Sequence, residues 1–132
     1  MKIGTLARRA GVAIDTVRYY EREGLLPAPA RLASGYRDYD DDAVERLRFI
    51  RRAKALGFTL GEIQELLQLS SRREEDMAGM KAAAIQKLAD VDAKLAELQR
   101  IRQGLTELVE SCPGHGALVH CPIMGALAGA DA

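Results

Sequence analysis

The feature that most constrains this chain is the run from Lys81 to Ser111, which contains no proline and only one glycine. Apolar residues recur in it at heptad spacing, which predicts a helix of roughly 46 Å at about 1.5 Å per residue. Such a helix finds no adequate packing partner within a chain of 132 residues, so we expect it to pair with its copy in a homodimeric coiled coil. A helix that lies on the N-terminal part of its own chain is the alternative. The seam positions hold Ala84, Leu88, Val91, Leu95, Leu98, Leu105, Val109 and Cys112, with Arg102 as the one polar break.

The N-terminal segment predicts two short helices joined by a sharp turn. An apolar stripe that starts at Ile3 indicates the first helix, and Gly11 supplies the turn. Asp15 and Thr16 stand where an N-cap is favoured for a second helix that runs through Arg22. This is helix-turn-helix geometry.

A small hairpin, or wing, is predicted next, because Ser34 and Gly35 form a turn signal. The acidic residues 40–42 indicate the start of a third helix, and Thr59 with Glu62 matches a capping box that opens a fourth. The sequence therefore predicts a mainly α fold. We expect a winged helix-turn-helix domain at 1–70, a linker at 71–80 and a dimerisation helix at 81–111. The loop and tail at 112–132 contain both cysteines of the chain, which makes this segment a candidate metal-binding loop.

Charge is distributed unevenly along a chain whose formal net charge is zero. Residues 1–60 carry twelve Lys and Arg against eight Asp and Glu, a net +4, and the remainder carries −4. A basic N-terminal part suggests an anionic partner, usually nucleic acid, although a chance imbalance on a solvated surface is the alternative. No apolar run is long enough to cross a membrane, and no signal peptide is recognisable, so we expect a cytoplasmic protein.

Two clusters carry candidate chemistry, and neither indicates an enzyme. The sequence contains no Gly-rich phosphate loop and no catalytic triad arrangement. Arg forks and Tyr hydroxyls are good phosphate donors, so an interleaved set of them is the candidate DNA interface. In the alternative interpretation, Tyr19 or Tyr20 packs in the core and the arginines are only solvated. The candidate DNA-binding residues are Arg18, Tyr19, Tyr20, Arg31, Tyr36 and Arg37.

The tail holds the only two cysteines, Cys112 and Cys121, in a loop that also contains His115 and His120. Thiolates are soft ligands that select ions such as Cu(I), Zn(II), Cd(II) and Hg(II). Proline and glycine residues between the cysteines allow both sulfurs to turn toward one point. Three alternatives stay open: inert buried cysteines, a disulfide, which a cytosolic setting disfavours, and a closed site of two Cys and two His that binds zinc.

The sequence resembles the MerR family of bacterial transcription regulators over nearly its whole length. The motifs that carry the resemblance are Ile3-Gly4-Thr5-Leu6-Ala7 with Gly11-Val12, Thr16-Val17-Arg18-Tyr19-Tyr20-Glu21 with Gly24-Leu25-Leu26, Ser34-Gly35-Tyr36-Arg37-Asp38-Tyr39, Arg48-Phe49-Ile50, and Leu56-Gly57-Phe58-Thr59-Leu60 with Ile63. The tail from Cys112 through Cys121-Pro122-Ile123 is similar to that of the metal-sensing branch.

This resemblance implies an antiparallel homodimer bound to promoter DNA, and it implies that the six candidate residues contact that DNA. It also implies a mechanism. The promoter hexamers lie slightly too far apart, and a metal ion makes the dimer bend and undertwist the DNA so that RNA polymerase can engage both.

Metal identity depends on Met77, which stands 35 residues before Cys112. In sensors of divalent ions the resemblance implies a third cysteine there, supplied by the partner subunit. In sensors of monovalent ions the resemblance implies a small polar residue there, so Met77 matches neither pattern. Because Met77 brings no thiolate, we expect Cu(I) or Ag(I) held by Cys112 and Cys121, with Met77, His115 and His120 as possible further ligands. The alternatives are the same architecture sensing Zn, Cd, Pb or Hg, a thiol redox switch, and a metal buffer without DNA function.

Overall fold

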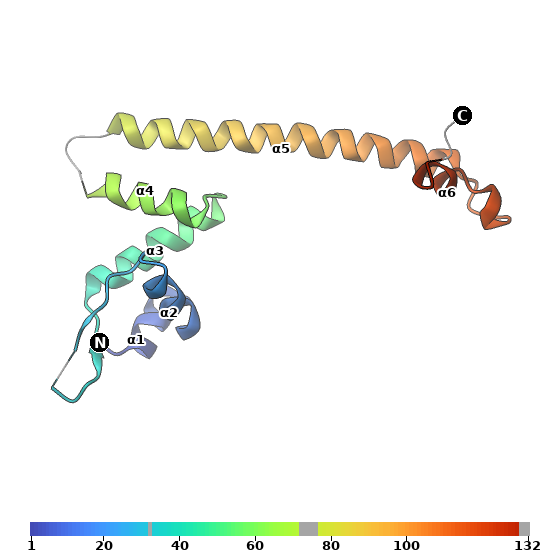
Figure 1. The fold of residues 1–132 in the computed structure, drawn as a ribbon. Helices are drawn as coiled ribbons and strands as arrows, with labels where there is room; N and C mark the ends of the chain where they lie inside the picture. Colours follow the sequence, from blue (N-terminus) through green and yellow to red (C-terminus); the bar gives the residue numbers. More distant parts are fainter. Residues whose placement is uncertain (32, 72–76, 130–132) are drawn as a thin grey trace. The chain divides into compact units, whose positions relative to one another are not determined.

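The computed structural model describes residues 1–31, 33–71 and 77–129, and it divides into two compact units, Met1–Lys87 and Leu88–Ala132. Figure 1 shows the first unit as a group of short helices with a hairpin. The second unit contains most of a long helix and two short helical segments at the C-terminal end. The mainly α class predicted from the sequence is confirmed.

Helices α1 (Ile3–Ala10) and α2 (Ile14–Arg22) form the predicted helix-turn-helix. Gly11 takes a left-handed φ of 72° at the end of α1, which only glycine adopts without strain. The prediction that Asp15 or Thr16 caps α2 is wrong, because the N-cap is Ala13, which makes no side-chain bond. The turn is so short that α2 begins before either polar residue, and Asp15 lies in its first turn instead.

The wing is a hairpin of two short antiparallel strands, β1 (Ala30–Arg31) and β2 (Arg37–Asp38). Its tip carries Gly35 at a φ of 84°, as the turn signal predicts. Figure 1 shows the hairpin projecting away from the helices. Residue 32 lies outside the described residues, as do side-chain details of Arg31.

Helices α3 (Asp41–Ala55) and α4 (Leu60–Ser70) follow, with the caps that the sequence predicts. Asp40 accepts a hydrogen bond from the backbone N–H of Ala43 at 3.1 Å. Thr59 and Glu62 form a complete capping box, in which each side chain accepts from the other's backbone N–H. These caps fix where α3 and α4 begin.

One core joins the four helices of the first unit. Its fully buried side chains come from α1 through α4 and from the loop after α2, so each amphipathic helix buries its apolar stripe against the others. This burial gives the candidate DNA-binding elements a rigid support. The largest of these side chains are Leu6, Val17, Leu25, Leu26, Val44, Leu47, Ile50 and Ile63.

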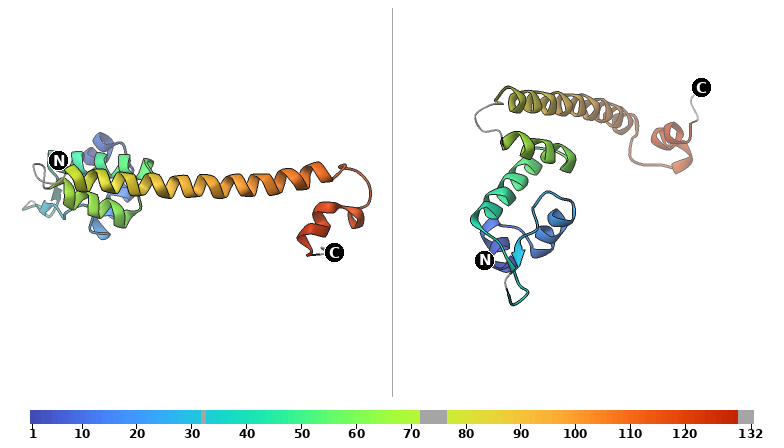
Figure 2. Two further views of the ribbon diagram at one scale, coloured as in Figure 1. Left: turned by 90° about the horizontal axis from the view of Figure 1, so that it is seen from above. Right: turned by 60° about the vertical axis from the view of Figure 1, so that its left-hand side comes forward.

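The long helix α5 spans Met77–Ser111, so the predicted start at Lys81 is four residues too late. Part of the predicted linker is therefore helical, and residues 72–76 of that linker lie outside the described residues. Met80 and Ala83 pack against the core of the first unit, and Lys87 is buried there. These contacts extend the helix backward and make its first turns part of the N-terminal unit. Figure 2 shows α5 as one uninterrupted helix.

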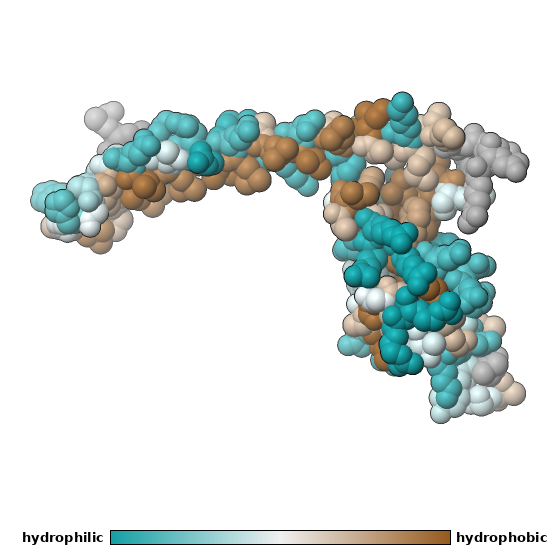
Figure 3. Space-filling view, turned by 180° about the vertical axis from the view of Figure 1, so that it is seen from behind, coloured by the Kyte–Doolittle hydropathy of each residue, from teal (hydrophilic) through white to brown (hydrophobic). Residues whose placement is uncertain are grey.

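Beyond Lys87 most apolar side chains of α5 stay exposed in the single chain, including Leu88, Leu95, Leu98 and Leu105. Figure 3 shows apolar side chains gathered along one side of this helix. After it come a 3₁₀ turn, η1 (Leu118–His120), and the short helix α6 (Pro122–Leu127). Within the described part of the chain, no helix is long and apolar enough to span a membrane.

Candidate nucleic-acid interface and metal centre

A basic groove lies between α1, α2 and the wing. Five cationic side chains line it, and Glu21 is the one acidic residue among the lining residues. Such a groove attracts an anion, and Arg and Tyr side chains at its edges suit phosphate oxygens. The lining residues are Lys2, Ile3, Gly4, Thr5, Arg8, Arg18, Glu21, Arg22, Gly35, Tyr36 and Arg37.

Helix α2 places its three candidate residues differently. Arg18 is exposed on the groove, with Asp15 of the preceding turn 3.7 Å away, and Tyr19 is 39% exposed with the Arg22 guanidinium near its ring. Tyr20 is buried among the core residues, and burial, followed by the neighbouring Tyr19, raises its pKa. Arg18 and Tyr19 are therefore available to a ligand, whereas the Tyr20 ring supports the core and can offer at most its hydroxyl.

The wing presents Tyr36 to solvent, with the Lys2 ammonium 4.6 Å from its ring centre. Arg37 points back to α2, where its guanidinium donates to the Glu21 carboxylate. Tyr39 donates to the same carboxylate through its hydroxyl. Burial, followed by this hydrogen bond, raises the pKa of Tyr39.

Glu21 therefore fastens the wing to α2, and the sequence does not indicate this role. Its partners stand 16 and 18 residues away along the chain, so no local periodicity pairs them. Arg37 consequently has a structural bond in addition to its proposed contact with DNA. The side chain of Arg31 lies outside the described structure, although its backbone forms β1.

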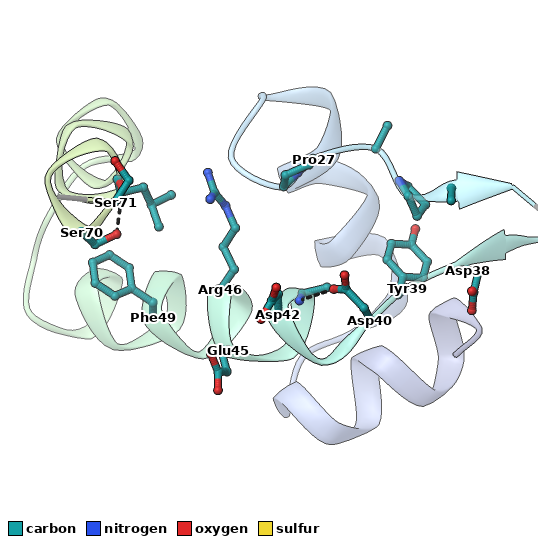
Figure 4. Close-up of a pocket in the computed structure, with 15 residues that line it drawn as sticks. Pro27, Asp38, Tyr39, Asp40, Asp42, Glu45, Arg46, Phe49, Ser70 and Ser71 are labelled. Carbon is teal, nitrogen blue, oxygen red and sulfur yellow. Dashed lines mark hydrogen bonds between the residues drawn. The ribbon is translucent and has the colours of Figure 1, made fainter. Parts of the chain in front are cut away.

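A second cavity lies between the loop after α2, the start of α3 and the end of α4 (Figure 4). Its rim is acidic, with Asp38, Asp40, Asp42 and Glu45 among its lining residues. Arg46 projects into it and donates from Nε to the backbone oxygen of Leu25 at 2.6 Å. Because carboxylates repel phosphate, the α1–α2–wing groove and not this cavity is the candidate nucleic-acid interface.

In the second unit, Cys112 and Cys121 bring their sulfurs within 3.8 Å of each other, and both thiols are free. Cys112 follows the last residue of α5, and Cys121 precedes α6. One ion that binds two thiolates at about 2.3 Å can hold sulfurs up to about 4.6 Å apart. The observed separation therefore fits a shared metal ion without a large movement of the loop.

The backbone amides of α6 act on the Cys121 sulfur. The amide of Met124 has the largest effect and lowers the pKa of the Cys121 thiol; partial burial opposes this, and the amide of Ile123 and the Cys112 thiol add to it. The geometry falls short of a regular N-cap hydrogen bond, so the effect is that of amides directed at the sulfur. A lowered pKa favours the thiolate, which is the metal-binding form.

The two histidines proposed from the sequence do not form a metal-binding group with this pair. His115 and His120 are exposed, and His115 Nδ1 lies 3.2 Å from the backbone oxygen of Pro113. Among the residues that the structure describes, no three His, Cys, Asp or Glu side chains are grouped for a metal ion. Met77 is the first residue of α5 and is 89% exposed. The centre that the described chain supplies by itself is a pair of sulfurs.

Comparisons with known proteins agree with this architecture. A family model described as "MerR HTH family regulatory protein" matches residues 1–70, and one described as "MerR, DNA binding" matches 44–108. The chain is 44% identical to a mercuric resistance operon regulatory protein of Bacillus cereus, over 96% of each chain. It is 38% identical to the HTH-type transcriptional regulator CueR of Yersinia pestis, over 98% of this chain and 92% of the relative.

A solved structure extends the similarity to three dimensions. The transcription regulator PbrR691 from Ralstonia metallidurans CH34, in complex with lead(II), has a TM-score of 0.87 and 39% identity, over 96% of this chain and 98% of that chain. A winged helix-turn-helix with a basic groove, followed by a long helix, defines a DNA-binding transcription regulator. The chain belongs to the MerR family, and within it to the metal-sensing branch.

Proposed function

We propose that this protein is a transcription activator that senses Cu(I) or Ag(I) through Cys112 and Cys121. The observation that carries the proposal is the sulfur pair, with a separation of 3.8 Å and no third donor grouped with it among the described residues. Two thiolates carry a charge of −2, and a monovalent ion leaves the site at only −1. Soft ions such as Cu(I) are selected by such ligands.

Zinc would require more than this pair supplies. It is almost always four-coordinate in structural sites, and catalytic sites also use three protein ligands. Met77 offers a neutral thioether where a divalent sensor of this family would supply a thiolate. The alternative is the same architecture answering Zn, Cd, Pb or Hg. The mercury- and lead-related names of two of its relatives favour that alternative, and it would need His115, His120 or a donor from a second chain.

The DNA-binding part of the proposal rests on the basic groove. Arg18 on α2, with Tyr36 and Arg37 of the wing, lines this groove and binds promoter DNA, and Tyr19 is exposed on the same helix. Arg31 is included from the sequence alone. The bound form is a homodimer held by the exposed seam of α5, and RNA polymerase engages the same promoter. The metal ion would bind the DNA-distorting form of the dimer more tightly than the other form, and it would thereby shift the equilibrium toward the form that distorts DNA.

A thiol redox switch is a second candidate, because the two free sulfurs already lie in contact. A two-electron oxidant such as a peroxide would accept the electrons as the two thiols lose their protons and form a disulfide. That switch would be triggered by oxidant without metal, and a reductant would reverse it. The two candidates therefore separate when promoter output is measured without oxygen.

An anaerobic titration of promoter output in a purified transcription system tests the proposal. Cu(I) and Ag(I) should activate at lower free concentration than Zn(II) and Cd(II), and Met77→Cys should gain a divalent response. Leu56→Cys, which adds a thiol at an exposed position of the first unit and outside the Cys112–Cys121 loop, serves as the control for an added cysteine. If Zn(II) or Cd(II) is the more potent activator, and His115→Ala or His120→Ala removes that response, the assignment to monovalent ions is wrong.

A further inference from the structure

The first unit buries one charged side chain among its described residues, and that side chain belongs to the long helix. Lys87 of α5 is 8% exposed. Its Nζ lies 2.8 Å from Oε1 of Glu62 on α4 and 5.6 Å from the ring centre of Phe58, in the turn between α3 and α4. A buried lysine is costly unless it is paired, so its position is strongly specified.

The carboxylate that receives Lys87 has a second role. The same atom, Glu62 Oε1, accepts the backbone N–H of Thr59 at 2.8 Å, which completes the capping box of α4. The hydrogen bond from Lys87, followed by that from Thr59, lowers the pKa of Glu62 from 4.5 to about 2. One oxygen therefore joins the long helix to the N-terminal end of α4.

The aliphatic part of Lys87 lies over the turn between α3 and α4. Gly57 takes a φ of 90° there, and a Cβ at this position would stand 4.0 Å from Cδ of Lys87. Lys87 therefore lies against Gly57 and Phe58 of the turn, and it is joined to Thr59 through the Glu62 carboxylate that both of them contact. The helix that enters this turn is α3, which directly follows the wing.

Helix α5 also connects Lys87 to the cysteine pair. α5 continues without a break from Lys87 to Ser111, and Cys112 is the next residue. A helix is a rigid element, so a rotation or shift imposed at its metal-binding end is carried along its length. Lys87 is the last residue of α5 within the first unit, and its ion pair adds to the packing of Met80 and Ala83 against the core of that unit.

We propose that the Lys87–Glu62 ion pair is a coupling latch, through which the metal-bound state of the cysteine pair reaches the DNA-binding unit. This inference rests on the proposed function and adds a residue pair that touches neither metal nor DNA. With the latch intact, movement of α5 moves the turn between α3 and α4, and with it α3 and the wing. Without the ion pair, the metal still binds and the operator is still recognised, but each event loses its effect on the other.

The test uses full-length protein, silver(I) as the metal and three measurements: silver affinity, operator affinity without metal, and the silver-dependent rise in promoter output. Lys87→Met keeps the length and the apolar stem of the side chain while it removes the charge. Glu62→Gln removes the other charge and preserves the capping box, since Gln serves at that position. The matched controls are Lys94→Met on the same helix and Glu65→Gln on α4, both at exposed positions.

We expect both latch variants to bind silver and metal-free operator as the parent does. Their silver-dependent rise in promoter output should be at least about fivefold smaller than that of the parent. Lys87→Arg should restore most of the rise. The controls should respond like the parent.

If the parent and both latch variants show the same silver-dependent rise in promoter output, the latch is wrong and the proposed function is unaffected. Loss of metal-free operator binding in both folded variants would also overturn the latch, because the pair would then only support the domain. A parent that binds operator but never responds to silver would overturn the proposed function, and the latch with it.

Discussion

The two units of this chain treat their apolar side chains in opposite ways. In Met1–Lys87, fifteen apolar residues form a buried core. In the second unit, from Leu88 to Gly129, no described residue is buried, although leucine and valine recur along α5. The first unit buries its apolar side chains within itself, whereas the second leaves an apolar stripe exposed to water that a partner would cover.

We propose that the partner is a second copy of the chain, paired through α5. The stripe is a heptad seam that includes Leu88, Leu95, Leu98 and Leu105, and such seams pair with similar seams. The dimer would remove from water the apolar area that the single chain leaves exposed. Stability should then depend on protein concentration for the second unit and much less for the first.

The largest expected effect comes from Leu98→Asp. It places a charge in the seam of both copies, and an uncompensated buried charge costs about 3–5 kcal/mol. We expect a monomer in sedimentation experiments at concentrations where the parent is a dimer. Ala93→Asp adds the same charge away from the seam and should leave the dimer intact. A monomeric parent at micromolar concentration would contradict the pairing.

Leu47→Ala should act on the first unit instead. Leu47 is completely buried, and Leu→Ala changes in cores cost about 2–5 kcal/mol. We expect a lower Tm with little dependence on protein concentration, measured by circular dichroism. The control is Leu56→Ala at the C-terminal end of α3, the helix that also contains Leu47. Leu56 is 68% exposed, so its substitution should change Tm only slightly. Equal effects of the two substitutions would mean that the core is assigned wrongly.

Arg18→Ala should weaken operator binding without affecting the second unit. Loss of one phosphate contact should reduce the slope of log K against log salt by about 0.9. The measurement is fluorescence anisotropy with labelled operator at several salt concentrations, with and without metal. Arg100→Ala, on the exposed surface of α5, is the control. An unchanged slope would remove Arg18 from the interface.

The smallest effect concerns pH and the Glu62 carboxylate. Its folded pKa of about 2 lies below the ordinary 4.5, so the stability that its ionised form contributes is present above the ordinary value and is lost as pH falls toward 2. The Tm difference between the parent and Glu62→Gln should be widest above about pH 5 and should narrow on acidification. Glu62 is 33% exposed, so solvent screening limits the effect. A difference that is constant with pH would contradict the ion pair.

Local signals in the sequence predicted most of the fold. The capping box of Thr59 and Glu62, the turn at Gly11 and the hairpin around Gly35 are encoded within a few residues, and each is observed. The sequence places the start of α5 too late because the polar run at 70–76 indicates a linker. Only packing on the first unit extends the helix there.

The sites were less predictable because their contacts join distant parts of the chain. Glu21 binds Arg37 and Tyr39 from another element, and Lys87 stands at a polar position beside the heptad seam, where no local pattern predicts burial against α4. Tyr19 and Tyr20 are adjacent, and only the packing of α2 shows that Tyr20 is the one in the core. The cysteine pair could be proposed from spacing and chemistry, whereas the separation of its sulfurs required the structure.

The central claim is that the pair of sulfurs in the second unit controls promoter output through a DNA-binding unit that folds around its own core. The most direct measurement compares the parent with Cys121→Ser in anaerobic transcription with Ag(I), alongside operator binding. The account predicts that Cys121→Ser binds operator with unchanged affinity and gives no rise in transcription with Ag(I). Full activation of Cys121→Ser by Ag(I) would show that this pair is not the sensor.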